Sequence, residues 1–200
     1  MRIKTFDINQ GRFLNGGEQR LAGNTKFAHV IVAGEGAAGN NSKAVATQAV
    51  LLTAIGNSSP VKFSTHPSGA VAKAVGSDVS VSAFQAVHSD NGLAGVYIVA
   101  DASNVASSVT SVVAALRSFK VADIEAIKKQ ALNNALRAKA HSDVYSVERA
   151  TQLLVSSDNY IQQISNVTAG DVEAAAQRLV KKLSLSSYGN ISQVPYVDSL

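Results

Sequence analysis

Apolar residues follow strand-like patterns over much of the first half of the chain and helical spacing in the second half. Residues 26 to 33 form a continuous apolar and β-branched run, which is typical of a buried strand. Residues 79 to 87 alternate for much of their length, and residues 93 to 99 form a second apolar run. Asn91 and Gly92 lie between these two runs. Asn-Gly readily adopts the two positive φ angles of a type I′ turn, so this region predicts an antiparallel hairpin.

Helical spacing governs the second half of the chain. Five apolar residues recur on one face of a helix: Val105, Val109, Val112, Val113 and Leu116. A second helix is expected to start near Val121, and Thr168 with Asp171 matches the capping box of a helix that reaches Leu183. Further helices and a last strand are expected over residues 42 to 55, 69 to 75, 144 to 156, 160 to 164 and 184 to 188. Helices grouped against a mostly antiparallel sheet predict a two-layer α+β fold, and residues 1–200 are expected to form a single domain.

The composition narrows the classes of function. Charged residues make up 16% of the 200 residues, against a usual value of about 25%, which favours a surface partly covered by protein partners. The net charge of +4 is dispersed and aromatic residues are 6%, so nucleic-acid binding is disfavoured. The chain has no cysteine and no apolar run of about 20 residues, which excludes thiolate chemistry and predicts no membrane span. The first seven residues lack the features of a signal peptide or an intact transit peptide.

The segment Gly34–Gly39 matches the pattern G-x-G-x-x-G between a predicted strand and a predicted helix. A dinucleotide-binding fold would place a pyrophosphate at that helix N-terminus. The acidic residue expected about 20 positions later is missing, because the next one after Glu35 is Asp78. The segment is therefore expected to be a flexible connection, with nucleotide binding as the weaker alternative.

No other pattern predicts a catalytic centre. The four histidines are scattered, and no two lie three or four positions apart: His29, His66, His88 and His141. His29 is expected to be a core histidine with its hydrogen bonds satisfied, in an apolar strand, rather than a metal ligand. No G-x-S-x-G elbow occurs, and Glu148 and Asp158 are expected to be ordinary helix carboxylates. The sequence thus predicts no catalytic, cofactor-binding or metal-binding residue, and no cofactor.

Three segments resemble one known family. The hairpin Ser89–Tyr97 resembles the motif S-D-x-G-L-x-G-x-Y, the tail Tyr188–Leu200 resembles G-N-L-x-x-x-P-x-x-D-x-L, and Gly16–Arg20 resembles G-G-E-x-R. Together they resemble the core protein 2 family of mitochondrial ubiquinol–cytochrome c reductase, which consists of pitrilysin-like metallopeptidase relatives without catalytic activity. The resemblance extends from about residue 16 to residue 200 and corresponds to the second, C-terminal half of a two-domain core protein.

The resemblance implies a structural and assembly subunit of complex III, not an enzyme, at the matrix side of the mitochondrial inner membrane. It implies core protein 1, other subunits of the cytochrome bc1 complex and an N-terminal half as partners, with the chain peripheral to the membrane. In this family the zinc motif lies in the first half of the catalytic subunit, so none is expected here. The alternative is the substrate-recognising α subunit of the mitochondrial processing peptidase. Its glycine-rich loop corresponds to residues 55 to 69, where this chain keeps two glycines and adds Pro60 and Pro67.

Overall fold

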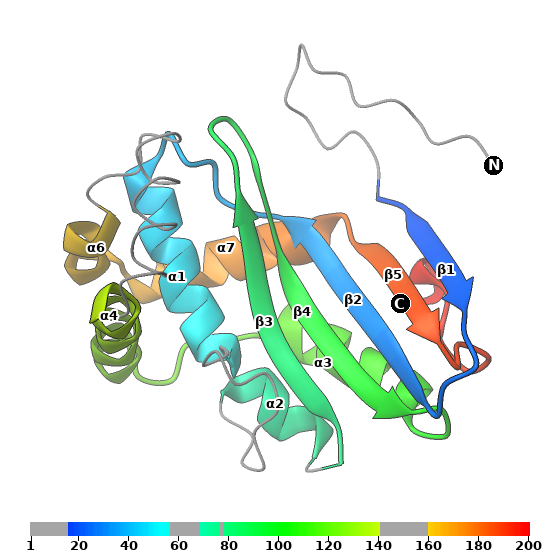
Figure 1. Cartoon of the computed structure of the whole chain (residues 1–200). Coiled ribbons are helices and arrows are strands. Elements are labelled where there is room, and N and C mark those ends of the chain that lie inside the picture. Colours follow the sequence, from blue (N-terminus) through cyan, green and yellow to red (C-terminus); the bar gives the residue numbers. More distant parts are fainter. Residues whose placement is uncertain (1–15, 57–68, 77, 141–159) are drawn as a thin grey trace.

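A computed structural model describes residues 16–56, 69–76, 78–140 and 160–200, and these residues form one five-stranded sheet with helices on one side (Figure 1). The strands are β1 (Glu18–Ala22), β2 (Phe27–Glu35), β3 (Ser80–Val87), β4 (Gly92–Asp101) and β5 (Ser184–Gly189). Their order across the sheet is β1-β5-β2-β4-β3. The pairing of β1 with β5 is parallel, and the other three pairings are antiparallel. The C-terminal strand therefore lies between the two N-terminal strands.

Helices pack on a single face of this sheet. They are α1 (Ser42–Gly56), α2 (Ala70–Val75), α3 (Val105–Arg117), α4 (Ile124–Ala140), α6 (Tyr160–Gln163) and α7 (Ala169–Lys181), with short 3₁₀ turns η1 (Ile164–Asn166) and η2 (Val197–Ser199). Helix α7 contacts β2, α3 contacts β4 and α1 contacts α7, while the strands pass in front of α3 and α7 in Figure 1. The predicted α+β class with a mostly antiparallel sheet is confirmed. That the whole chain forms a single domain stays a prediction.

The core forms between the sheet and the helices because every second strand residue points toward them. On β2 and β4 these are the even-numbered residues, such as Val30 and Ile98, which are fully buried. The helices contribute their apolar faces. The largest fully buried side chains include Leu51, Ile55, Ile98, Leu116, Leu179 and Leu185. One continuous apolar cluster therefore joins α1, α3 and α7 to the sheet.

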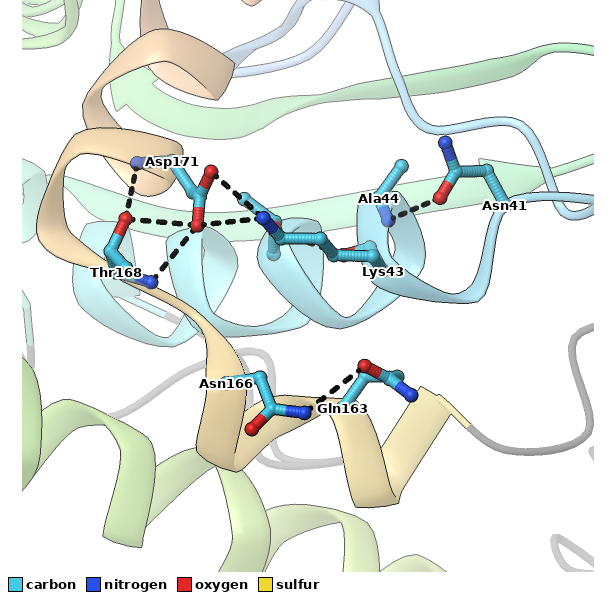
Figure 2. A network of polar contacts seen from close by, with 8 residues as sticks. Asn41, Lys43, Ala44, Gln163, Asn166, Thr168 and Asp171 are labelled. Carbon is cyan, nitrogen blue, oxygen red and sulfur yellow. Dashed lines mark hydrogen bonds and ion pairs between the residues drawn. The ribbon is translucent and has the colours of Figure 1, made fainter.

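Helix α7 begins with the capping box that its sequence predicts. The Thr168 hydroxyl accepts the Asp171 N–H at 3.2 Å, and the Asp171 carboxylate accepts the Thr168 N–H at 3.1 Å. Figure 2 shows that Lys43 of α1 reaches the same carboxylate, with its Nζ 3.3 Å away. At the start of α1 the Asn41 side chain accepts the Ala44 N–H at 3.0 Å, as an N-cap does. The carboxylate that caps α7 thus also pairs with Lys43 at the start of α1.

The hairpin is confirmed, but the predicted type I′ turn is wrong. Gly92 pairs with Val87 inside the ladder, so the loop has four residues, 88 to 91. Gly92 has no positive φ, unlike four other glycines of the described residues. A Cβ at Gly92 would lie 2.1 Å from the carbonyl oxygen of Ala37. Glycine is needed there for close backbone approach, and not for a left-handed turn.

One predicted helix begins three residues later than expected, and another lies outside the described residues. The helix expected from Val121 begins at Ile124, where the Asp123 carboxylate accepts the Ala126 N–H at 3.0 Å. This side-chain cap marks the helix start better than the apolar pattern does. The helix expected over residues 144 to 156 lies outside the described residues.

Candidate functional site

The connection Gly34–Gly39 is tied to the hairpin by its own backbone amides. The Gly36 N–H donates to the Gly92 carbonyl at 2.8 Å, and the Gly39 N–H donates to the His88 carbonyl at 2.7 Å. Both amides would have to be free to cradle a pyrophosphate. The segment is therefore more constrained than its sequence predicts, and its geometry opposes the nucleotide alternative.

A buried glutamine holds the Gly34–Gly39 connection to α1 and β3. Gln48 of α1 is buried, and its Oε1 accepts the N–H of Ala37. Its Nε2 donates to Oε1 of Gln85 on β3 at 2.8 Å. A buried amide needs such partners, and these join the helix, the connection and the sheet. The polar groups of Gln48 thus stabilise the fold.

The histidines do not converge. His29 lies on β2, and its Nδ1 is 2.6 Å from the Tyr97 hydroxyl on β4. The predicted hydrogen bond of His29 is confirmed, but its predicted place in the core is wrong, because the partly buried ring lies on the sheet face opposite the helices. His88 lies in the exposed hairpin loop, whereas His66, His141, Glu148 and Asp158 lie outside the described residues. Across residues 16–56, 69–76, 78–140 and 160–200, no three histidine or acidic side chains are grouped as metal ligands.

Two charged residues of β1 hold the C-terminal tail. Arg20 Nη2 donates to the carbonyls of Ile191 at 3.0 Å and Val194 at 2.8 Å, and Nη1 lies 2.6 Å from Oε1 of Glu18. Oε2 of Glu18 accepts the N–H of Val197 at 3.0 Å. A guanidinium suits this role because its planar fork offers several fixed donors at once. We call Glu18 and Arg20 the tail clamp.

An aromatic ring also packs on the tail clamp. The Tyr196 ring lies over the Arg20 guanidinium, with 4.4 Å between Cζ and the ring centroid. Further along, Nη2 of Arg117 on α3 donates to the carbonyl oxygen of Leu200 at 2.9 Å. The Gly-Gly-Glu segment and the tail motif, which resemble the same family at opposite ends of the sequence, are thus one structural unit.

A shallow hollow of about 390 Å³ lies beside this tail. Its lining includes the cations Arg117, Lys181 and Lys182, together with Asp198. Arg117 and Lys181 stand in the last turns of α3 and α7, where positive charge offsets the helix dipole. The helix dipoles therefore explain why Arg117 and Lys181 stand at these positions. Nothing else in the lining of the hollow indicates a ligand.

The second face of the sheet is a surface feature that the sequence did not predict. It consists of the odd-numbered residues of β1, β2 and β4 and the even-numbered residues of β3 and β5, which point away from the helices. Among the described elements, no helix packs on this side. We call it the open sheet face. Only the continuous apolar run of β2, which puts apolar residues on both faces of the sheet, could have indicated it.

Tyrosine and histidine rings gather at the centre of the open sheet face. The His29 ring stacks on Tyr97 at a centroid distance of 6.0 Å and contacts Tyr188 at 6.1 Å. Partial burial raises the pKa of Tyr97. Such a surface combines apolar area with the polar groups of one histidine and two tyrosines. Within the described residues, no helix is both long and apolar enough to cross a bilayer.

The comparisons with curated proteins agree with the three sequence motifs. No family model matches the chain. The chain is 28% identical over 200 residues to the human cytochrome b-c1 complex subunit 2, mitochondrial, and this match covers 92% of the chain but 44% of the human protein. It is 27% identical over 200 residues to the mitochondrial-processing peptidase subunit alpha-2 of Dictyostelium discoideum, covering 90% of the chain and 42% of that protein. The chain thus spans less than half the length of these relatives.

Solved structures share the fold. A chain of complex III2 from Candida albicans matches with a TM-score of 0.74 and 20% identity, covering 92% of this chain and 48% of that one. The peptidase M16 inactive domain from Pseudomonas fluorescens matches with a TM-score of 0.68 and 11% identity, covering 91% and 45%. These identities bear on the fold alone. Over nine-tenths of its length the chain is similar to cytochrome b-c1 complex subunit 2, which confirms the resemblance that the hairpin, the tail and the Gly-Gly-Glu segment predict.

Proposed function

We propose that this chain belongs to a non-catalytic structural and assembly subunit of mitochondrial ubiquinol–cytochrome c reductase. The observation that carries the proposal is the similarity to cytochrome b-c1 complex subunit 2 of human, mouse and rat over 92% of the chain in each case. The subunit supports electron transfer from ubiquinol to cytochrome c by holding the assembly together. It lies at the matrix side of the inner membrane, peripheral to the bilayer.

The surface chemistry supports a role in packing. The tail clamp and the buried Gln48 use their polar groups inside the chain, and on the open sheet face the His29 ring is hydrogen-bonded to Tyr97 amid exposed apolar area. Such a face suits burial against protein. Because the matched relatives are more than twice as long as the matched region, the partners include the remaining part of such a subunit, core protein 1 and other subunits of the cytochrome bc1 complex.

Affinity purification tests this proposal. The chain is tagged at its own locus, mitochondria are solubilised in mild detergent, and the tagged material is recovered. We expect a reduced-minus-oxidised difference spectrum with the bands of b-type and c-type haem, and core protein 1 among the co-purifying proteins. Recovery of the tagged chain without any cytochrome signal would remove the proposal.

One observation favours a second candidate, the α-type subunit of the mitochondrial processing peptidase. The similarity to the Dictyostelium processing-peptidase subunit covers 90% of the chain. In that role the protein would bind substrate for a zinc-bearing partner. The test adds the purified protein to the zinc-bearing subunit and measures cleavage of a basic presequence peptide. A rate above that of the zinc-bearing subunit alone favours this candidate over the structural one.

A further inference from the structure

We infer that Asn91 is a site of spontaneous deamidation, and that the folded hairpin loop protects it until the loop opens. This modification lies outside the proposed function and does not depend on it. Asparagine is followed by glycine at two positions of the chain, Asn15 and Asn91, and the structure describes the second of them. Asn91 is partly exposed and ends the loop of residues 88 to 91, which lies at one end of the sheet (Figure 1).

The reaction needs only water and these two neighbouring residues. The backbone nitrogen of Gly92 attacks Cγ of the Asn91 side chain, a new N–Cγ bond forms, and the Cγ–Nδ2 bond breaks. The amide group leaves as ammonia with the proton that the Gly92 nitrogen loses, and a cyclic succinimide remains. Water then opens the ring at one of its two carbonyl groups, which gives aspartate or isoaspartate. Glycine favours the attack because no side chain shields its nitrogen and its backbone rotates freely.

Backbone contacts on both sides of the reacting peptide group oppose this attack in the folded chain. The His88 N–H donates to the Asn91 carbonyl at 2.9 Å, and the Gly36 N–H donates to the Gly92 carbonyl at 2.8 Å. Gly92 also packs closely, since a Cβ added there would lie 2.1 Å from the Ala37 carbonyl oxygen. Ring closure needs a ψ angle at Asn91 outside the regions that L-residues ordinarily occupy, so the peptide group must rotate. The rotation carries the Asn91 carbonyl away from the His88 N–H.

The products of the reaction fit the folded loop less well than asparagine does. Isoaspartate leads the main chain through Cβ and so adds a carbon to the backbone before Gly92. This displaces Gly92 from its close contact with Ala37 and from the Gly36 N–H. Both products also place a new carboxylate beside the exposed Asp90, and like charges repel. The modified chain therefore keeps a weakened loop, and the modification records that the loop has opened.

Two variants at His88 test the hydrogen bond that protects the loop. His88→Pro removes the N–H that donates to the Asn91 carbonyl, whereas His88→Ala keeps this N–H and removes the same imidazole. We expect Asn91 to convert about fivefold faster in His88→Pro than in His88→Ala, because the lost hydrogen bond favours the open loop. Circular dichroism establishes that both variants are folded. Equal rates in the two folded variants would overturn the inference.

The wild-type chain provides a test that depends on neither variant. The chain is incubated at neutral pH in buffer and in concentrated guanidinium chloride, and peptide mass spectrometry measures the conversion of Asn91 to aspartate and isoaspartate. We expect the folded chain to react at least about tenfold more slowly than the unfolded one, because only the fraction with an open loop reacts. Equal rates in the two states, or no conversion of Asn91 in the unfolded chain, would overturn the inference.

Discussion

The guanidinium of Arg20 lies 2.8 Å from the carbonyl oxygen of Val194, although 174 residues separate the two in sequence. The contact is set up by the sheet, because β1 pairs in parallel with β5 and so ends beside the segment that leaves β5. Arg20 also reaches the carbonyl of Ile191, and Glu18 completes the tail clamp. Both ends of the described chain are thereby held to one edge of the sheet.

Replacing Arg20 with alanine should lower the free energy of unfolding by about 2 kcal/mol. The variant leaves carbonyl groups of the tail, as well as the Glu18 carboxylate, without their cationic donor, and hydrogen bonds to charged groups are worth about 1.5–3 kcal/mol. Urea denaturation measures the loss. Amide hydrogen exchange should also accelerate in residues 190 to 200, which the clamp no longer holds.

Arg178→Ala is the control for the tail clamp. Arg178 is an exposed arginine on α7, and its replacement should change stability by no more than about 0.5 kcal/mol. Arg20→Lys should be only partly tolerated, because an ammonium cannot reproduce the fork. Equal stability of the Arg20→Ala and Arg178→Ala proteins would show that the clamp has no structural value.

Gly34→Ala should destabilise the protein by about 2–3 kcal/mol, because its added methyl group has no room. A Cβ at Gly34 would lie 1.8 Å from the carbonyl oxygen of Leu179, where β2 touches α7. Gly17→Ala is the matched control, since nothing lies within 4 Å of the Cβ it adds. Thermal and urea unfolding of both variants provide the comparison.

The Gly34→Ala variant also distinguishes a structural role of the Gly34–Gly39 segment from a nucleotide-binding role. Isothermal calorimetry with NAD should give no binding heat for the wild-type protein, because the Gly36 and Gly39 amides are already engaged. Measurable NAD affinity that Gly34→Ala abolishes while the protein stays folded would restore the nucleotide alternative.

Stability should fall in acid through Asp171. Hydrogen bonds from the Thr168 backbone N–H and then from its hydroxyl hold the pKa of Asp171 below its ordinary value, with Lys43 contributing less. A depressed folded-state pKa stabilises the protein above the unfolded value of about 3.9, and this contribution is lost as the pH falls through the folded value. Unfolding measured between about pH 6 and pH 2 should show a weaker pH dependence in Asp171→Asn than in the wild type. Identical curves would mean that the capping box is not coupled to protonation.

Features that depend on neighbouring residues could be predicted from the sequence. The Thr168–Asp171 capping box and the Asn41 cap follow from side chains that bond amides two or three positions away. The antiparallel hairpin follows from two apolar runs joined by a polar loop. Its turn type was mispredicted because Asn-Gly also satisfies a different need, which is the close approach of Gly92 to Ala37.

Features that depend on distant residues could not be predicted in this way. The parallel pairing of β1 with β5 joins segments about 170 residues apart, and no local period encodes that register. The tail clamp depends on this pairing, so neither Glu18 nor Arg20 was expected to hold the tail. The open sheet face was hidden for a related reason, since the apolar run of β2 indicates burial without showing what covers its second side.

Depletion of the protein in its own mitochondria tests the central claim most directly, with two rates measured in the same preparation. The proposed structural role predicts that ubiquinol–cytochrome c reductase activity and the assembled complex on a native gel both decline, while cleavage of a presequence peptide continues at its original rate. Re-expression of the wild-type chain's gene should restore the reductase. Unchanged reductase activity together with lost presequence cleavage would contradict the claim and identify the protein as part of the processing peptidase.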